Sequence, residues 1–253
     1  MADLGFIGPV EKRLGSRTKR RTGLAALIDP DNFSVDAATS VAKIADSLGF
    51  EAIFVGGSTI GDQGHLDDVV YDIKSHVTCP VILFPGNVTG ISRHASAILF
   101  SSLLNSTNIY FIVGAQALGA IQVERYGLEA IPMGYLVFGD TSTTSFIGQV
   151  RSIPHGKSSI AVMYALAAQY LGMRALYLEA GSGSNHPMPS EVVRAVRKHF
   201  KGLLIVGGGI TTPETAVQLS NAGADILVIG NLLETKGFKT QLVPIVKAIK
   251  GNA

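Results

Sequence analysis

Apolar runs alternate with amphipathic stretches along the whole chain. Eight of these runs are rich in Val, Ile, Leu and other apolar residues without regular polar alternation, which is typical of parallel strands covered on both faces. They occupy residues 24–28, 52–55, 81–84, 98–104, 131–138, 175–178, 203–206 and 226–229. Helical periodicity follows at residues 35–48, 158–171, 189–200 and 213–221. Alternating strand–helix units of this number predict an α/β fold, a closed (β/α)8 TIM barrel.

Local signals mark where several helices begin and end. Ser34 precedes the first helix, where a hydroxyl group can accept a hydrogen bond from an unpaired backbone N–H group. Gly172 and Gly223 follow two later helices, as expected for residues that end a helix in a left-handed conformation. These signals support the helix assignments independently of the apolar pattern.

The third unit is shorter than the others. Only about a dozen residues, 85–97, separate the third strand from the fourth, which is too few for two loops and a crossover helix. A missing helix would leave an apolar groove on the barrel wall, and residues 98–104 and 109–117 would form its floor. The alternative is one short helix that begins at Ser92 and covers the wall in the usual way.

The composition favours a single globular domain. The chain has 253 residues, 47% of them hydrophobic, and no run of about 18 apolar residues that would span a bilayer. We expect residues 23–253 to form one catalytic barrel. Cys79 is the single cysteine, so no disulfide can form within the chain, and a reducing cytoplasm is the expected compartment.

Residues 1–22 carry an excess of positive charge and form a basic N-terminal arm. The net charge of the chain is +2, and this arm contains six bases, Lys12, Arg13, Arg17, Lys19, Arg20 and Arg21, against two acids. The simplest interpretation is a solvated helix or tail, and the alternative is contact with an anionic membrane surface. A nucleic-acid partner is disfavoured, because Phe6 is the one aromatic residue that the arm offers for stacking on a base.

Three glycine-rich turns follow the last three predicted strands. They are residues 177–183 (YLEAGSG), 207–210 (GGGI) and 229–231 (IGN). Glycine lets the backbone turn tightly and brings bare N–H groups close to a ligand. Because the last two turns lie where a (β/α)8 barrel places its phosphate site, together they predict a cup of backbone amides for a phosphate group.

Four side chains at predicted strand ends carry the candidate chemistry. Glu179 is a carboxylate among glycines, which suits a general base for a substrate hydroxyl, and Tyr177 lies two residues earlier on the same strand face. The alternative for Glu179 is an ion pair with a barrel Arg or Lys. Asp29 and Ser58 end the first two strands and offer hard oxygen ligands that suit Mg²⁺. The alternative for Asp29 is a capping role in the turn before Pro30.

Six motifs, taken in order, resemble the geranylgeranylglyceryl phosphate synthase family. They are Asp-Pro at 29–30, Gly-Gly-Ser at 56–58, Phe-Pro-Gly-Asn at 84–87 and the three glycine turns. The resemblance covers nearly the whole chain after residue 22. It implies a (β/α)8 barrel whose third helix is replaced by a mobile stretch, and an enzyme that is usually a homo-oligomer.

The same resemblance implies the substrates, the cofactor and the roles of the site residues. The substrates would be sn-glycerol 1-phosphate and geranylgeranyl diphosphate, with Mg²⁺ held on the diphosphate by Asp29 and Ser58. Glycerol phosphate would be bound by Tyr177, Leu178, Glu179, Ala180, Gly181, Ser182, Gly183, Gly208, Gly209, Gly230 and Asn231. Glu179 would accept the proton of the C3 hydroxyl while its oxygen attacks the prenyl chain, forming an ether of archaeal membrane lipids. Bacterial relatives carry a lysine at the position of Leu27. The role of that lysine in binding the phosphate therefore does not carry over to this chain.

Two other functions fit parts of the pattern. A phosphosugar isomerase or aldolase would use the same phosphate cup without a metal-bound diphosphate, and the short third unit argues against it. A non-catalytic barrel would bind prenyl phosphates or dock a membrane enzyme, and the pairing of Tyr177 with Glu179 argues against that.

Overall fold

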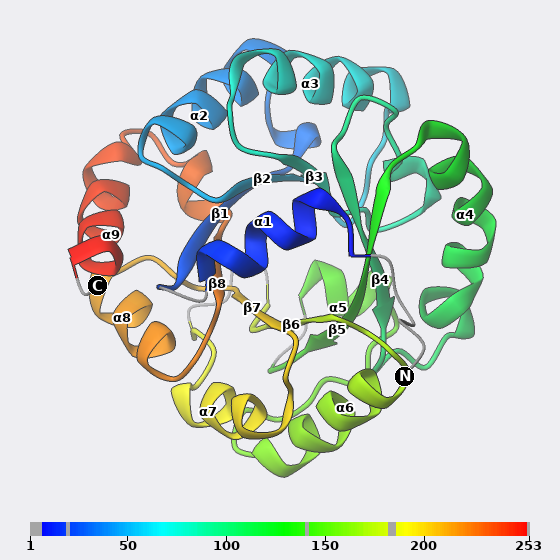
Figure 1. Cartoon of the computed structure of the whole chain (residues 1–253), viewed down its shortest axis with the longest axis vertical. Coiled ribbons are helices and arrows are strands. Elements are labelled where there is room, and N and C mark those ends of the chain that lie inside the picture. The colour runs from blue at the N-terminus through cyan, green and yellow to red at the C-terminus, as the bar shows by residue number, and fades with distance from the viewer. Residues whose placement is uncertain (1–6, 19–20, 140–141, 182–185, 252–253) are drawn as a thin grey trace.

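The computed structural model describes residues 7–18, 21–139, 142–181 and 186–251. Eight parallel strands form a closed barrel in which neighbours in the chain are neighbours in space, and β8 pairs with β1 (Figure 1). The strands are β1 Gly23–Ile28, β2 Ala52–Val55, β3 Val81–Leu83, β4 Ala97–Leu103, β5 Glu129–Val137, β6 Ala175–Glu179, β7 Leu203–Gly207 and β8 Ile226–Ile229. The predicted TIM barrel is therefore confirmed, with strand ends that differ by one or two residues.

Helices surround the barrel. They are α2 Val35–Ser47, α3 Gln63–His76, α4 Ala115–Tyr126, α6 Ser158–Tyr170, α7 Ser190–His199, α8 Pro213–Asn221 and α9 Lys239–Gly251. The four predicted helices correspond to α2, α6, α7 and α8. Ser34 caps α2 by accepting a hydrogen bond from the Ala37 N–H group. Apolar side chains fill two layers, one inside the barrel and one between the strands and the helices. This closed packing fixes the strand ends on which the site is built.

The connection from β3 to β4 contains only a single-turn 3₁₀ helix, η2 Val88–Gly90. The shortened third unit is confirmed, and the alternative helix beginning at Ser92 is wrong. Polar contacts hold this segment instead: the Ser92 hydroxyl donates to Asp67 of α3, and the Arg93 guanidinium lies 5.0 Å from the centre of the Tyr126 ring on α4. The segment thus spans the gap between two helices without adding one.

The basic arm contains a helix, α1 Pro9–Thr18, that crosses the N-terminal end of the barrel (Figure 1). Leu14 is fully buried in the inner layer. Glu129 accepts hydrogen bonds of 2.8 Å from two backbone N–H groups of the first turn, and Arg174 forms a 2.8 Å ion pair with Glu11. The expectation of a solvated helix or tail is therefore wrong, because the closed barrel leaves an apolar opening that Leu14 fills.

Two short elements lie near the other end of the barrel. The helix α5 Thr143–Ile147 begins with a reciprocal capping box between Ser142 and Ser145. Between β4 and α4, the π-helix η3 Tyr110–Gly114 widens the backbone turn, and the Ser102 hydroxyl donates to the Ile112 carbonyl at 2.7 Å. π-Helical turns of this kind occur frequently at functional sites.

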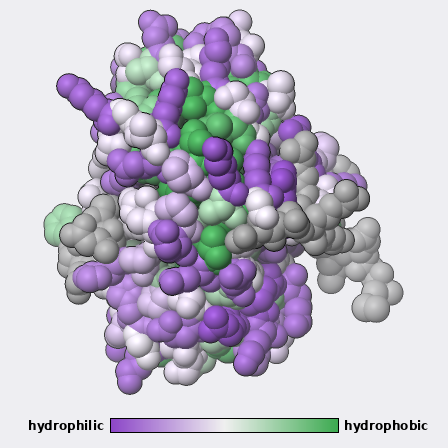
Figure 2. Space-filling model, turned by 90° about the vertical axis from the view of Figure 1, so that its left-hand side faces the viewer, coloured by the Kyte–Doolittle hydropathy of each residue, from purple (hydrophilic) through white to green (hydrophobic). Residues whose placement is uncertain are grey.

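Exposed apolar side chains gather on one side of the molecule. Apart from Ile7, the large ones among the described residues lie between positions 71 and 171, on or beside α3, α4, α5 and α6. The side that carries α2, α8 and α9 is covered mainly by hydrophilic side chains (Figure 2). Within the described residues, no helix combines the length and apolar character needed to cross a membrane.

Candidate active site

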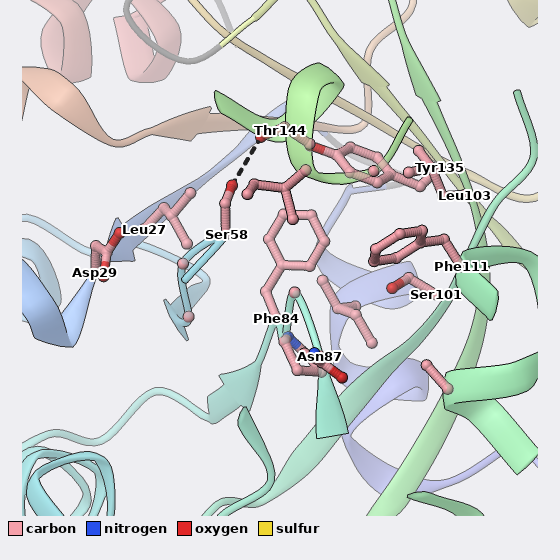
Figure 3. Close-up of a pocket in the computed structure, with 18 of the residues that line it drawn as sticks. Leu27, Asp29, Ser58, Phe84, Asn87, Ser101, Leu103, Phe111, Tyr135 and Thr144 are labelled. Carbon is pink, nitrogen blue, oxygen red and sulfur yellow. Dashed lines mark hydrogen bonds between the residues drawn. The ribbon is translucent and has the colours of Figure 1, made fainter. Parts of the chain in front are cut away.

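A large pocket opens where the C-terminal ends of the strands meet. Asp29 and Ser58 lie on one side of it, Ser101 and Phe111 on the other, and Phe84 projects between them (Figure 3). Leu27, Glu179 and Gly230 also line the pocket. The predicted metal residues, the predicted base and the last glycine turn therefore share one cavity.

Glu179 ends β6 and is almost fully buried, with 6% of its surface exposed. Burial raises the pKa of its carboxyl group to about 7, although hydrogen bonds from the Gly181 N–H group, at 2.8 Å, and from Tyr177 lower that pKa. Within the described part of the chain, Glu179 forms no ion pair with an Arg or Lys. The alternative that Glu179 serves only in an ion pair inside the barrel is therefore wrong. A carboxyl group with this pKa is suited to exchanging a proton near neutral pH.

Gly208 makes room for the Glu179 carboxylate. A Cβ atom at position 208 would lie 2.5 Å from Glu179 Oε1, and the residue has a left-handed φ of +89°. A larger residue would therefore be strained and would displace the carboxylate. The glycine turn after β7 thus leaves the space in which the Glu179 carboxylate lies.

Three aromatic rings form the inner wall beside the base. Phe84 stacks on Tyr177 with ring centres 5.1 Å apart, and Tyr135 packs against both rings in edge-to-face contacts. Burial and then the charge of Glu179 raise the pKa of Tyr135 well above its usual value, while a hydrogen bond with Thr144 lowers it. Sequence reasoning missed Tyr135 and Thr144. Tyr135 meets Tyr177 through the register in which β5 pairs with β6, and this register is known only from the structure.

Asp29 lies at the end of β1 and accepts a 3.1 Å hydrogen bond from the Asp31 N–H group. The predicted capping role is therefore confirmed. Burial, followed by repulsion from Asp31 and Glu234, raises the pKa of Asp29 to about 6. The carboxylate packs against the turn that carries Ser58, because a Cβ atom on Gly57 would lie 2.3 Å from it. The two predicted metal ligands thus come from adjoining strand ends.

Asp29 and Ser58 offer oxygen atoms of the kind that a hard divalent cation takes as ligands. A cation near Asp29 would offset the repulsion among Asp29, Asp31 and Glu234 that raises the pKa of Asp29. In the parts of the chain that are described, no cluster of three or more His, Cys, Asp or Glu residues could enclose a metal ion. Mg²⁺ commonly uses one or two carboxylates and completes its shell with water and substrate phosphates, so these residues suit a metal that arrives with a phosphorylated substrate.

The three predicted phosphate turns have different surroundings. Gly181, Gly208 and Gly209 all adopt left-handed φ angles, whereas Gly230 does not, and Gly230 and Asn231 line the pocket directly. Leu178 is buried in the layer between strands and helices, so only its backbone can contact a ligand in the pocket. Ser182 and Gly183 lie outside the described residues, and their predicted roles stay predictions.

The pocket continues outward as the groove that the short third unit predicts. Its lining includes Leu99, which belongs to the inner layer, and Ile98, which belongs to the outer layer. Phe111 and Gly119 close the side toward α4. The floor predicted from residues 109–117 is only partly correct, because Ile109 and Val113 are 71% and 54% exposed.

Comparisons with known proteins agree with this geometry. A family model described as the PcrB family matches residues 17–249. The geranylgeranylglyceryl phosphate synthase of Cenarchaeum symbiosum is 53% identical over 247 residues, covering 97% of this chain and 100% of that protein. The corresponding protein of Nitrosopumilus maritimus is 51% identical, covering 95% of this chain and 97% of its own length.

A solved structure matches over nearly the whole chain. It is (S)-3-O-geranylgeranylglyceryl phosphate synthase from Thermoplasma acidophilum in complex with sn-glycerol-1-phosphate, 39% identical with a TM-score of 0.92. The alignment covers 97% of this chain and 100% of that structure. The chain therefore belongs to the PcrB family, in which it stands with the geranylgeranylglyceryl phosphate synthases.

Proposed function

We propose that this protein joins the C3 hydroxyl of sn-glycerol 1-phosphate to geranylgeranyl diphosphate, with Mg²⁺ as cofactor, and releases diphosphate. One observation carries the proposal: the buried carboxylate of Glu179 lies in a pocket that combines the glycine turn after β8 with an apolar groove. The glycine turn suits a phosphate, and the groove suits a prenyl tail. The carboxylate lies where the two reacting ends would meet.

Each part of the site has a distinct task in this reaction. Backbone N–H groups around Gly208, Gly230 and Asn231 bind the phosphate of glycerol phosphate and orient its C3 hydroxyl toward Glu179. Glu179 accepts the hydroxyl proton as the oxygen forms a bond to C1 of the prenyl chain. The bond between C1 and the diphosphate oxygen breaks at the same carbon, and the electron pair leaves with diphosphate.

Asp29 and Ser58 are the residues that would hold Mg²⁺ together with the diphosphate. A bound divalent cation neutralises the charge that develops on a phosphate leaving group. The Tyr177 hydroxyl favours the ionised form of Glu179 through its hydrogen bond, and the stacked ring of Phe84 supports Tyr177. The chain thereby supplies orientation and a base.

We further propose that the protein is a cytoplasmic homo-oligomer that acts in archaeal lipid biosynthesis. Exposed apolar side chains on α4 and α6 support an oligomer, because large apolar patches are usually covered by a partner. Membrane contact through the basic arm is less well supported. Because α1 lies at the barrel end opposite the strand C-termini, such contact would turn the pocket away from the lipid.

A prenyl-transfer assay tests the proposal directly. The protein is incubated with sn-glycerol 1-phosphate, radiolabelled geranylgeranyl diphosphate and Mg²⁺, and the lipid extract is analysed for an acid-stable ether. We expect product that requires both substrates and disappears with EDTA. Metal-independent turnover of a triose or pentose phosphate would instead support the isomerase or aldolase alternative. Tight binding of the prenyl diphosphate without any product would support the non-catalytic alternative.

A further inference from the structure

Asp29 lines the pocket and is followed directly by a single-turn 3₁₀ helix, η1 Pro30–Asn32. The Asp31 N–H group donates to the Asp29 carboxylate, and the Asn32 N–H group donates to the Asp29 carbonyl, each at 3.1 Å. A 3₁₀ turn has poorer hydrogen-bond geometry than an α-helix, so neighbouring elements have to fix its position. If this turn moves, the Asp29 carboxylate moves with it.

His65 holds this turn from the side of α3. Its Nε2 atom lies 3.0 Å from the Pro30 carbonyl oxygen and 2.9 Å from the Phe33 carbonyl oxygen. Because a carbonyl oxygen only accepts hydrogen bonds, Nε2 carries the hydrogen atom and donates to both. Pro30 is the first residue of η1, and Phe33 directly follows its last. One side chain therefore holds both ends of the turn.

His65 is itself fixed by the start of α3. It lies in the first turn of that helix, and its backbone N–H group donates to the Asp62 carboxylate at 3.2 Å. The next residue, Leu66, is fully buried between the strands and the helices. The imidazole ring therefore extends from a backbone that has little freedom to move.

Two further polar contacts reach the turn, and both use exposed side chains. The Gly61 N–H group donates to Asp31 at 3.4 Å, and the Asn32 amide donates to Glu234 at 3.1 Å. Such bonds exchange with bonds to water and add little. Asp31 and Glu234 also repel the negative charge of Asp29. The turn therefore depends on the histidine to keep its position until a cation offsets this repulsion.

We propose that His65 is a positioning residue for the Mg²⁺ site. By holding the turn, it keeps the Asp29 carboxylate on the side of the pocket that carries Ser58 (Figure 3). His65 lies outside the pocket that the described residues form, so it acts through the backbone of the turn. Removing a residue that orients a metal ligand typically weakens metal binding by roughly 10–100-fold. This inference rests on the proposed magnesium-dependent transfer and adds a residue to it.

Three variants test the contact. His65→Leu removes the N–H group, whereas His65→Gln keeps a donor at about the same distance from the backbone. His76→Leu is the matched control, because it removes a histidine that contacts a carbonyl, that of Asp72, near the end of the same helix. Hydrogen exchange followed by mass spectrometry measures the backbone N–H groups of residues 31–33. We expect exchange at least about fivefold faster in His65→Leu and near wild type in the other two variants.

Binding of the donor tests the role in the metal site. Geranylgeranyl diphosphate is titrated into the full-length protein by calorimetry, with Mg²⁺ or with EDTA and without glycerol phosphate, so no transfer takes place. We expect His65→Leu to weaken binding about tenfold in Mg²⁺ and less than twofold in EDTA. His65→Gln should recover most of the loss, and the affinity for glycerol phosphate should stay unchanged throughout. A merely structural role would lower the melting temperature without this dependence on the metal.

The two measurements give clear contrary outcomes. Wild-type exchange, or wild-type affinity in Mg²⁺, in folded His65→Leu would overturn the inference. An equal loss of affinity with Mg²⁺ and with EDTA would overturn it as well. If His65→Leu does not fold, His65→Asn replaces it, since its shorter amide stays polar but ends nearer to the backbone. Absence of any transfer by the wild-type protein would instead overturn the proposed function.

Discussion

The Ser58 hydroxyl lies 3.0 Å from the Thr144 hydroxyl, so a hydrogen bond joins the end of β2 to α5 across the pocket (Figure 3). The two residues are 86 positions apart in the chain. If Ser58 donates this hydrogen bond, both lone pairs of its oxygen remain available to coordinate a metal ion or to accept hydrogen bonds. Ser58 can therefore hold α5 and contribute to a metal site at the same time.

The first prediction separates these two roles. Ser58→Ala removes both the bond and the proposed ligand, whereas Thr144→Val removes the bonds of Thr144 to Ser58 and Tyr135 and keeps the proposed ligand. We expect Ser58→Ala and Asp29→Asn to raise the Mg²⁺ concentration for half-maximal activity and the KM for the prenyl diphosphate by about tenfold, and Thr144→Val to change them less than threefold. Magnesium titrations at pH 7.5 measure this. Equal effects in Ser58→Ala and Thr144→Val would assign Ser58 a purely structural role.

The second prediction concerns Glu179 as the base. Glu179→Gln should lower kcat about 10²-fold or more and leave the affinity for glycerol phosphate nearly unchanged. Because the pKa of Glu179 is about 7, the activity of the wild-type protein should rise as the pH increases from 6 to 8. A kcat close to wild type in the glutamine variant would remove Glu179 from the mechanism.

The same substitution should stabilise the fold at alkaline pH. The pKa of Glu179 is raised from 4.5 to about 7, so the folded protein holds this proton more tightly than the unfolded chain does. The contribution of the Glu179 carboxyl group to the free energy of unfolding is fully present below about pH 4.5 and is lost as the pH rises through about 7. Thermal unfolding of Glu179→Gln should therefore show a gain of about 1–3 kcal/mol at pH 8 and little gain at pH 4.5. An equal effect at both pH values would contradict this account.

The third prediction tests the phosphate site at Gly230. A Cβ atom there would lie 3.7 Å from Leu27, an ordinary contact, but φ is −117° and ψ is −90°, a conformation that residues with a side chain rarely adopt. Gly230→Val should therefore cost some stability and lose at least about tenfold in affinity for glycerol phosphate, because its methyl groups enter the pocket. Circular dichroism checks that the fold is kept. Titration calorimetry measures the affinity. Gly156→Val, at an exposed glycine with open space around it, is the control and should bind normally.

The fourth prediction concerns the helix that closes the barrel. Leu14→Ala should lower the free energy of unfolding by about 2–4 kcal/mol, because a fully buried side chain leaves a cavity. Its kcat at 25 °C should stay within twofold of wild type, since α1 lies opposite the pocket. Denaturant unfolding and a steady-state assay measure the two quantities. Ser16→Ala, on the exposed face of the same helix, should change neither.

The fifth prediction is the donor preference of the wild-type protein. Each buried CH₂ group contributes about 0.8 kcal/mol, so five additional carbons in the groove are worth far more than a factor of ten. We therefore expect kcat/KM for geranylgeranyl diphosphate to exceed that for farnesyl diphosphate by at least about tenfold. Direct competition measures the ratio. Equal incorporation would mean that the groove ends before the twentieth carbon.

The sequence alone determined the barrel and the core of the site. Continuous apolar runs reflect strands buried on both faces, so their number and spacing were readable without coordinates. Residues two apart on a strand share a face, and that rule placed Tyr177 beside Glu179. The short stretch between β3 and β4 indicated a groove, because it leaves too little room for two loops and a crossover helix of normal length.

Contacts between distant parts of the chain were decided only by the tertiary structure. Closing the barrel and folding α5 over its mouth bring Thr144 to Ser58 and Tyr135 to Tyr177, and no local pattern marks these pairs. Leu14 is one apolar residue in a charged segment, and the opening that buries it exists only once the strands have closed. Local sequence rules describe how each segment folds by itself, whereas such contacts depend on how the segments pack together.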